Sequence, residues 1–305
     1  MCIASAVALH AQSPSPSWPF PSGSPAAAAT PALPRATPPP YDVPLRQVRW
    51  EDLTNHEISP AGAQALALQP AQWRQGETDH FIIHYRGMSD ALQVAREIEF
   101  DLWHVAQSLG AEPGQYARKS HVYIFRGKKE WQKFLFQTRL PEWVHSFALR
   151  DDLFLELRAA EGGFDSHTLA HETTHAVVAR IYGHRSWPLW LSEGFAEYMG
   201  GASVAARNSR SARSSQRKLP FAKMTVAELF ATQRYPEAPL DVARLYDTSA
   251  KFVRYLFNKY PPELFPKFVE RVLTDASPAA ALVEIYGSEF SDMADFEKRF
   301  SRFTR

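Results

Sequence analysis

The sequence predicts an α+β fold, in which a small mixed sheet with helices is followed by a mainly helical C-terminal half. Three observations predict it. Short runs rich in β-branched and aromatic residues alternate with segments of helical period before residue 163. From Phe164 onwards the apolar pattern is almost wholly helical. The tract before Tyr41 is rich in Pro, Ser and Ala and lacks the apolar periodicity that a core requires.

These observations divide the chain into three segments. Residues 1–40 are expected to be a signal remnant and a disordered linker, 41–163 the sheet-containing half, and 164–305 the helical half. With 305 residues, 45% of them hydrophobic, the chain is long enough to bury a sizeable core in one or two packed lobes.

The N-terminus resembles the end of a secretory signal. Met1 to Ala11 is small and apolar, and cleavage is plausible after Ala11, but no Lys or Arg precedes the apolar run. Either the natural start lies upstream or this is an ordinary flexible terminus. Because a Pro-, Ser- and Ala-rich tract follows, we expect a secreted or periplasmic protein.

Residues 41–163 are expected to alternate strands and helices. The long helix has Ser89 as its N-cap and ends at Gly110, and a tight Asp151-Asp152 turn joins the last two strands. The predicted strands are 79–86, 121–125, 144–150 and 153–158, and the predicted helices are 89–109 and 128–138.

The C-terminal half opens with two helices that carry the candidate site. Asp165 or Ser166 can cap the first helix, and Gly183 ends it. Pro188 suits the first turn of the second helix, and Gly200-Gly201 is expected to end it. Further helices are predicted at 224–233, 241–259, 262–274, 278–286 and 290–303. The basic run 207–218 is interpreted as a solvated loop, with a lid or a site for acidic partners as the alternative.

Composition excludes several classes of protein. Lys plus Arg is 34 and Asp plus Glu is 33, so the net charge does not indicate a nucleic-acid partner. The single cysteine, Cys2, excludes an intrachain disulfide framework and Cys-based zinc fingers. No apolar run reaches the roughly 18 residues of a membrane span. A bound metal must therefore be held by His and carboxylate side chains.

His171-Glu172-Thr173-Thr174-His175 is the strongest functional signal. Residues four apart share a helix face, so both imidazoles can meet one cation, and Glu172 lies on the neighbouring edge. Glu193, on the next predicted helix, is the natural third ligand. Two neutral imidazoles and one carboxylate leave a zinc ion net positive, which acidifies water and polarises a carbonyl. Glu172 can then serve as general base and later as general acid in amide hydrolysis.

These histidines and their neighbours also have alternative interpretations that involve no metal. His171 and His175 as satisfied core histidines with Glu193 as a capping acid would require three unrelated coincidences. His167 lies one turn earlier, but Thr168 follows it and cannot act as a base, so His167 is interpreted as a surface or outer histidine. Glu197 is either a hydrogen-bond partner of a ligand histidine or a solvated acid.

The combined motifs resemble the gluzincin metallopeptidases, specifically the peptidase MA-like group related to the large zinc aminopeptidases. The resemblance covers about residues 150–260 and rests on H-E-x-x-H, on Trp190-Leu191-Ser192-Glu193-Gly194-Phe195-Ala196, and on the segment from Tyr246 to Leu256, where Ser249 replaces the family's glycine. It implies a zincin-like fold, one zinc ion held by His171, His175 and Glu193, and a hydrogen bond from Tyr246 to the oxyanion. On the residues alone, an aromatic that opens an apolar helix is more often part of the core.

One departure from that family affects specificity. The aminopeptidases carry a G-x-M-E-N segment whose glutamate binds the free amine of the substrate, and nothing between Leu135 and Ala170 matches it. We therefore expect an endopeptidase rather than an aminopeptidase. The predicted strand 152–158 either pairs with an extended substrate or is plain sheet structure. A non-catalytic metal-binding or peptide-binding module of the same fold, and a hydrolase of non-peptide amides, are the rival functions.

Overall fold

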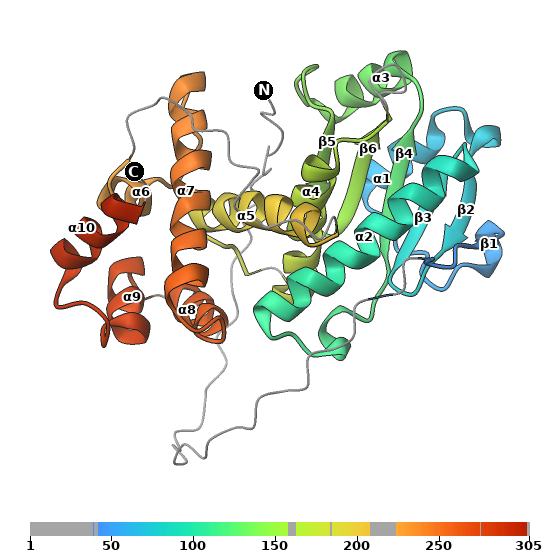
Figure 1. Cartoon of the computed structure of the whole chain (residues 1–305). Coiled ribbons are helices and arrows are strands. Elements are labelled where there is room, and N and C mark those ends of the chain that lie inside the picture. The colour runs from blue at the N-terminus through green and yellow to red at the C-terminus, as the bar shows by residue number, and fades with distance from the viewer. Residues whose placement is uncertain are drawn as a thin grey trace, which may run out of the picture.

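The structure is a computed structural model that describes residues 39, 42–157, 163–183, 185–207, 224–274 and 276–303. The expected signal remnant, nearly all of the expected linker and residues 208–218 of the basic run lie outside the described residues. Within the described ranges, the chain has a mixed α and β fold, as the sequence predicts. Its sheet is on one side of the molecule and a group of helices is on the other (Figure 1).

One open sheet contains the six strands of the described residues, in the order β1-β2-β3-β4-β6-β5. The central neighbours β3, β4 and β6 run parallel, whereas β1, β2 and β5 pair in antiparallel fashion. The strands are β1 (Arg46–Val48), β2 (Arg74–Glu77), β3 (Phe81–Tyr85), β4 (Ser120–Phe125), β5 (Ser146–Leu149) and β6 (Asp152–Glu156). Strand β5 is therefore an edge, and β6 is paired on both sides.

Helices cover both faces of the sheet. Helix α2 (Met88–Leu109) and helix α4 (Ser166–Tyr182) pack on one face, and α1 (Pro60–Ala67) and α3 (Lys128–Thr138) on the other (Figure 1). Alternate residues of the strands supply two apolar cores. The core under α2 and α4 continues into the helical half, so the two halves share one hydrophobic interior.

Helix α5 (Leu189–Arg207) lies between α4 and α7 (Pro239–Lys259) and packs against both. Its buried Trp190 contacts Phe252 of α7 at a ring-centroid distance of 5.4 Å. Helices α6 (Val226–Ala231) and α10 (Met293–Phe303) contact α7, and α8 (Leu264–Leu273) packs against α9 (Pro278–Tyr286). Short 3-10 turns occur at Trp50–Asp52, Pro70–Gln72 and Pro113–Tyr116.

Most predicted elements of the sheet half are found, and the differences have local causes. Strands β1 and β2 were not predicted, because Arg46–Val48 and Arg74–Glu77 are short and polar and are held mainly by backbone pairing. Helix α2 begins at Met88 with Gly87 as N-cap, so Ser89 is not the cap. The hairpin turn is formed by Arg150 and Asp151, since Asp152 already pairs with Leu149 in the sheet.

Helix α5 does not end at Gly200-Gly201 but continues to Arg207. A Cβ at position 200 would lie 3.0 Å from the backbone oxygen of His167, so Gly200 allows α5 to approach α4 rather than ending the helix. A Cβ at Gly194 would lie 2.6 Å from the backbone oxygen of Ser249 on α7. Two glycines thus set the distances between α5 and its neighbours.

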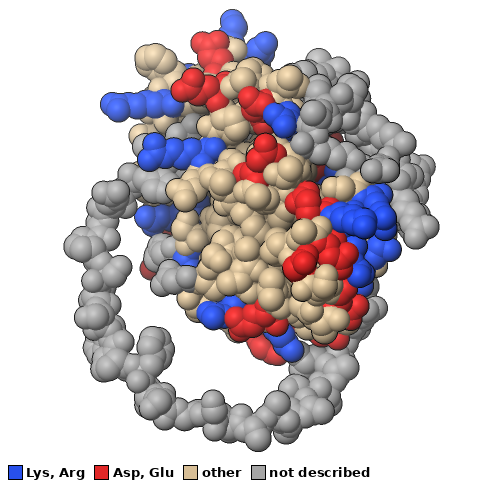
Figure 2. All heavy atoms as spheres, turned by 90° about the vertical axis from the view of Figure 1, so that its left-hand side faces the viewer, with Lys and Arg blue, Asp and Glu red and all other residues tan. Residues whose placement is uncertain are grey.

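The exposed surface of the C-terminal helices carries charges of both signs. Figure 2 shows acidic and basic residues mixed around a broad area of uncharged residues on this face. The formal net charge of the chain is +1, which agrees with this mixture. No helix in the described ranges is long and apolar enough to span a membrane.

A close pair of buried histidines lies on the face of the sheet under α1. His84 Nε2 is 2.8 Å from His121 Nδ1, and both side chains are almost fully buried. Burial lowers the pKa of His84 well below its ordinary value and lowers the pKa of His121 to about 4. Nearby Asp152 behaves in the opposite way, because burial raises its pKa to about 6.

We expect Gly194→Ala to reduce the unfolding free energy by about 1–3 kcal/mol or more, because the added methyl group would clash with backbone rather than with a mobile side chain. Chemical denaturation measures the change. Gly114→Ala is the matched control, because a Cβ there meets no atom within 4 Å. Equal stabilities of the two variants would contradict the close approach of α5 and α7.

The buried imidazole of His121 should make stability depend on pH. Its folded-state pKa lies below the unfolded value of about 6.5, so its contribution is complete above that pH and is lost as pH falls towards 4. Because Asp152 opposes this trend, the effect is measured as a difference from His121→Gln. The stability of the wild type relative to this variant should fall by about 2 kcal/mol between pH 7 and pH 5. A difference that does not change with pH would contradict the prediction.

Candidate metal centre

Three potential metal ligands from two helices converge at one point. Their ligand atoms all lie within 4.8 Å of one another. His171 Nε2 is 3.1 Å from His175 Nε2 and 3.4 Å from Glu193 Oε2, and His175 Nε2 is 3.7 Å from Glu193 Oε1. Helix α4 supplies both imidazoles from one face, and α5 supplies the carboxylate. The structure therefore brings together the residues that the sequence predicts as ligands.

The donor set fits a metal ion. Ligands of one tetrahedral ion at roughly 2.0–2.1 Å are about 3.3 Å from each other, close to the separations found here. Glu193 Oε2 is buried and has no hydrogen-bond partner in the described part of the chain. Such an atom is costly unless a cation or a donor meets it. His171, His175 and Glu193 can thus hold one metal ion.

The carboxylates and imidazoles of the centre shift each other's pKa values. Burial disfavours the charge of Glu193, yet the His175 and His171 imidazoles keep its pKa well below the ordinary value. Burial also disfavours the charge of His171, but the neighbouring carboxylates of Glu193 and Glu197 raise its pKa well above the ordinary value. The carboxylates of Glu193 and Glu197 thus stabilise positive charge between the two helices.

A second layer of side chains orients the ligand histidines. Glu197 Oε2 is 3.3 Å from His171 Nδ1, and Glu197 Oε1 is 3.4 Å from His167 Nε2. Ser192 Oγ is 3.3 Å from His175 Nδ1. These contacts hold the Nδ1 side of each ring and leave each Nε2 directed at the centre. Glu197 is therefore a partner of a ligand histidine, and His167 lies outside the ligand set.

Glu172 lies beside the centre without being one of the ligands. It is fully buried, and its Oε2 accepts a hydrogen bond of 3.0 Å from the backbone nitrogen of Ala148 on edge strand β5. Its charge acts on both His171 and Tyr235. The carboxylate is thus positioned jointly by the helix that carries the histidines and by the edge of the sheet.

Tyr246 reaches the centre from α7. Its ring lies 6.2 Å from the ring of His171 in a stacked orientation, and its hydroxyl is close enough to Glu193 and Tyr235 for both side chains to raise its pKa. Burial is the largest cause that raises its pKa, and the charge of Glu193 adds to it. The phenol therefore keeps its proton and can donate a hydrogen bond near neutral pH.

Tyr235 is a site residue that sequence reasoning missed. Its hydroxyl donates a hydrogen bond of 2.6 Å to Glu193 Oε1. It lies in the connection between α6 and α7, where neither helical period nor motif marks it. The only available signal was its place shortly before Tyr246, next to Pro236.

Of the two interpretations of strand 152–158, the structure confirms plain sheet structure and contradicts pairing with a substrate. Strand β6 (Asp152–Glu156) pairs with β4 on one side and with β5 on the other, so its backbone groups are already used. Strand β5 has the open edge instead. The error arose because the sequence shows two adjacent strands but does not show which of them closes the sheet.

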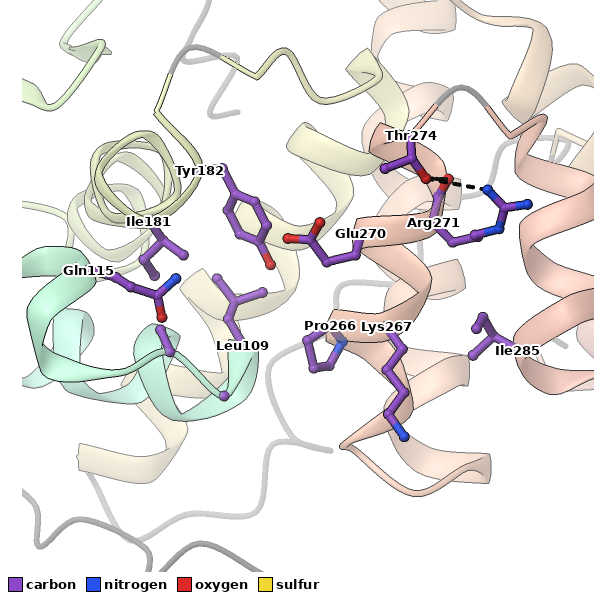
Figure 3. A pocket seen from close by; sticks show the side chains of 12 residues that line it. Leu109, Gln115, Ile181, Tyr182, Pro266, Lys267, Glu270, Arg271, Thr274 and Ile285 are labelled. Atoms are coloured by element: carbon purple, nitrogen blue, oxygen red, sulfur yellow. Dashed lines mark hydrogen bonds between the residues drawn. The ribbon is translucent and has the colours of Figure 1, made fainter. Parts of the chain in front are cut away.

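An open pocket of about 590 Å³ lies apart from this centre. Leu109 at the end of α2, Ile181 and Tyr182 at the end of α4, and residues of α8 line it (Figure 3). None of the three candidate ligands lines this pocket, so the pocket is not part of the candidate metal centre. Glu270 is close enough to Tyr182 to contribute to the rise in its pKa, of which burial is the main cause.

No family model matches the chain, and no curated protein matches it.

We expect the purified protein to bind one zinc ion per chain, and Glu193→Ala and His175→Ala to lose stoichiometric binding. Each change removes one of three ligands, so the remaining two cannot hold the ion tightly. Metal analysis after dialysis measures the content. His167→Ala should keep one ion, because His167 is not one of the three converging ligands. Stoichiometric zinc in both ligand variants would contradict the assignment.

Proposed function

We propose that the protein is a zinc-dependent peptidase of gluzincin type that hydrolyses peptide bonds without a covalent intermediate. The observation that carries the proposal is the combination of three converging ligands with Glu172 and Tyr246 around one point. The H-E-x-x-H and W-L-x-E-G-F-A resemblance supports the same class, and with it a zincin-like fold. When bound, the zinc ion lowers the pKa of water and polarises the substrate carbonyl.

In this proposal Glu172 moves the proton. Its carboxylate takes a proton from the attacking water as the water oxygen bonds to the carbonyl carbon. It then gives this proton to the nitrogen as the C–N bond breaks, so the products are a carboxylate and an amine. The hydrogen bond from the Ala148 backbone fixes the direction of the Glu172 carboxylate.

Tyr246 supplies the hydrogen bond to the substrate oxyanion. Its phenol lies in a largely buried environment beside His171 and Glu193, where a preorganised donor stabilises developing charge more than water does. Because it comes from α7 rather than from the helices with the ligands, the complete site requires the packing of three helices.

The outer edge of β5, apart from the Ala148 N–H that is donated to Glu172, offers a place for an extended substrate. Ala148 on this strand contacts Glu172, so a peptide added to the edge would run close to the base. No counterpart of the amine-binding segment of the aminopeptidases occurs between Leu135 and Ala170. An endopeptidase is therefore the preferred form of the activity, and export to a secreted or periplasmic location is proposed from the N-terminal residues.

Glu172→Gln is expected to keep stoichiometric zinc and to lower peptide cleavage by about 10²–10⁴-fold, because the amide cannot accept the proton of water. Metal analysis and a peptide-cleavage assay on the same preparation measure both properties. Glu142→Gln, an exposed acid in a loop, is the control and should keep full activity. Undiminished cleavage by Glu172→Gln would rule out the proposed base.

A further inference from the structure

Glu193 is held by two phenols that differ in position. Tyr235 comes from the connection before α7, whereas Tyr246 lies within α7. Tyr235 donates to Glu193 Oε1 at 2.6 Å, a short bond to a charged acceptor. Tyr246 interacts with the same carboxylate and with the Tyr235 hydroxyl.

The two carboxylate oxygens of Glu193 have different surroundings. Oε1 has the Tyr235 hydroxyl as its donor. Oε2 is buried, 3.4 Å from His171 Nε2, and has no hydrogen-bond partner among the described residues. Glu193 is only 2% exposed, so water has little access to either of its carboxylate oxygens. Oε2 is therefore the oxygen that is left for a metal ion.

We propose that Tyr235 is a positioning residue that keeps Glu193 a one-oxygen metal ligand and lets the Tyr246 hydroxyl turn to the substrate. The proposal rests on the zinc-peptidase function and deepens it by assigning separate roles to the two phenols. A carboxylate whose Oε1 is held by Tyr235 would offer chiefly Oε2 to an ion, and this would leave one coordination position for water. Tyr235 also holds the carboxylate when the Tyr246 hydroxyl leaves it.

The geometry favours this division over the reverse. The hydroxyl of Tyr235 makes its short bond to the ligand itself, which fixes the ligand rather than a substrate. The ring of Tyr246 lies 6.2 Å from the ring of His171, so this tyrosine stands beside an imidazole of the centre as well as beside Glu193. Because Tyr235 donates its one hydroxyl proton to Glu193, the single proton of the neighbouring Tyr246 hydroxyl is the one that can be redirected to a substrate oxygen.

The test compares Tyr235→Phe with Tyr246→Phe in the full chain, with zinc affinity measured by competition with a chelator. Tyr235→Phe should weaken zinc binding by about 10–100-fold, the usual effect of removing a partner of a metal ligand. Tyr246→Phe should change the affinity much less than Tyr235→Phe does, because Tyr235 makes the 2.6 Å bond to Glu193 Oε1, and it should lower kcat. Tyr182→Phe, which removes a hydroxyl at the far end of α4, is the control and should change neither property.

Cobalt-substituted protein gives a readout that a merely structural role would not change. The visible absorption of Co²⁺ depends on coordination number, so Tyr235→Phe should shift the spectrum towards a higher coordination number as Glu193 binds through both oxygens. Tyr246→Phe should keep the spectrum of the wild type. If Tyr235→Phe does not fold, adding Co²⁺ to Tyr246→Phe still tests the assignment, because a changed spectrum there would give Tyr246 the positioning role.

Two outcomes overturn the proposal: zinc affinity and cobalt spectrum unchanged in Tyr235→Phe, or both changed in Tyr246→Phe instead. These readouts need no turnover, so they are separate from the proposed activity. A wild-type protein that binds zinc but cleaves no peptide would reject the peptidase function, while the affinities and spectra would still decide the role of Tyr235.

Discussion

The interaction on which the site depends is the meeting of the Glu193 carboxylate with the two imidazoles of α4. It joins α5 to α4 at the centre, and the phenols of Tyr235 and Tyr246 join the segment around α7 to the same group. The close packing that allows this comes from small residues. Because Gly200 has no side chain, His167 of α4 can approach α5 closely, and Gly194 allows the backbone of α7 to do the same. Helix α5 therefore carries both a candidate metal ligand, Glu193, and the two glycines that allow close packing, Gly194 and Gly200.

The sheet contributes to the site through its edge rather than through its centre. Edge strand β5 donates a backbone hydrogen bond to Glu172, and the apolar face of the sheet continues into the core beneath α4. The sheet thus fixes the position of helix α4, which carries the histidines, and the direction of the Glu172 carboxylate. A single interior under both halves explains how residues far apart in sequence keep their separations.

The ligand set was predictable from sequence because helical spacing alone places His171 and His175 on one face. The polar strands β1 and β2 were not, since their backbone pairing leaves no apolar pattern. The prediction that Gly200 ends a helix was wrong, because sequence does not distinguish such a glycine from one that allows a neighbouring helix to approach closely. Tyr235 could not be predicted, because only tertiary structure brings a loop tyrosine to Glu193. The division into three segments stays a prediction.

The central claim, that this centre performs metal-dependent peptide hydrolysis, is tested most directly by digestion of a mixed peptide library. The library contains peptides with free and with blocked N-termini and is digested before chelation, after chelation and after zinc is restored. We expect cleavage at internal bonds of both kinds of peptide, which is lost on chelation and recovered when zinc is restored. Absence of cleavage, or cleavage that persists without metal, would contradict it, and cleavage confined to free N-terminal residues would reject the endopeptidase assignment.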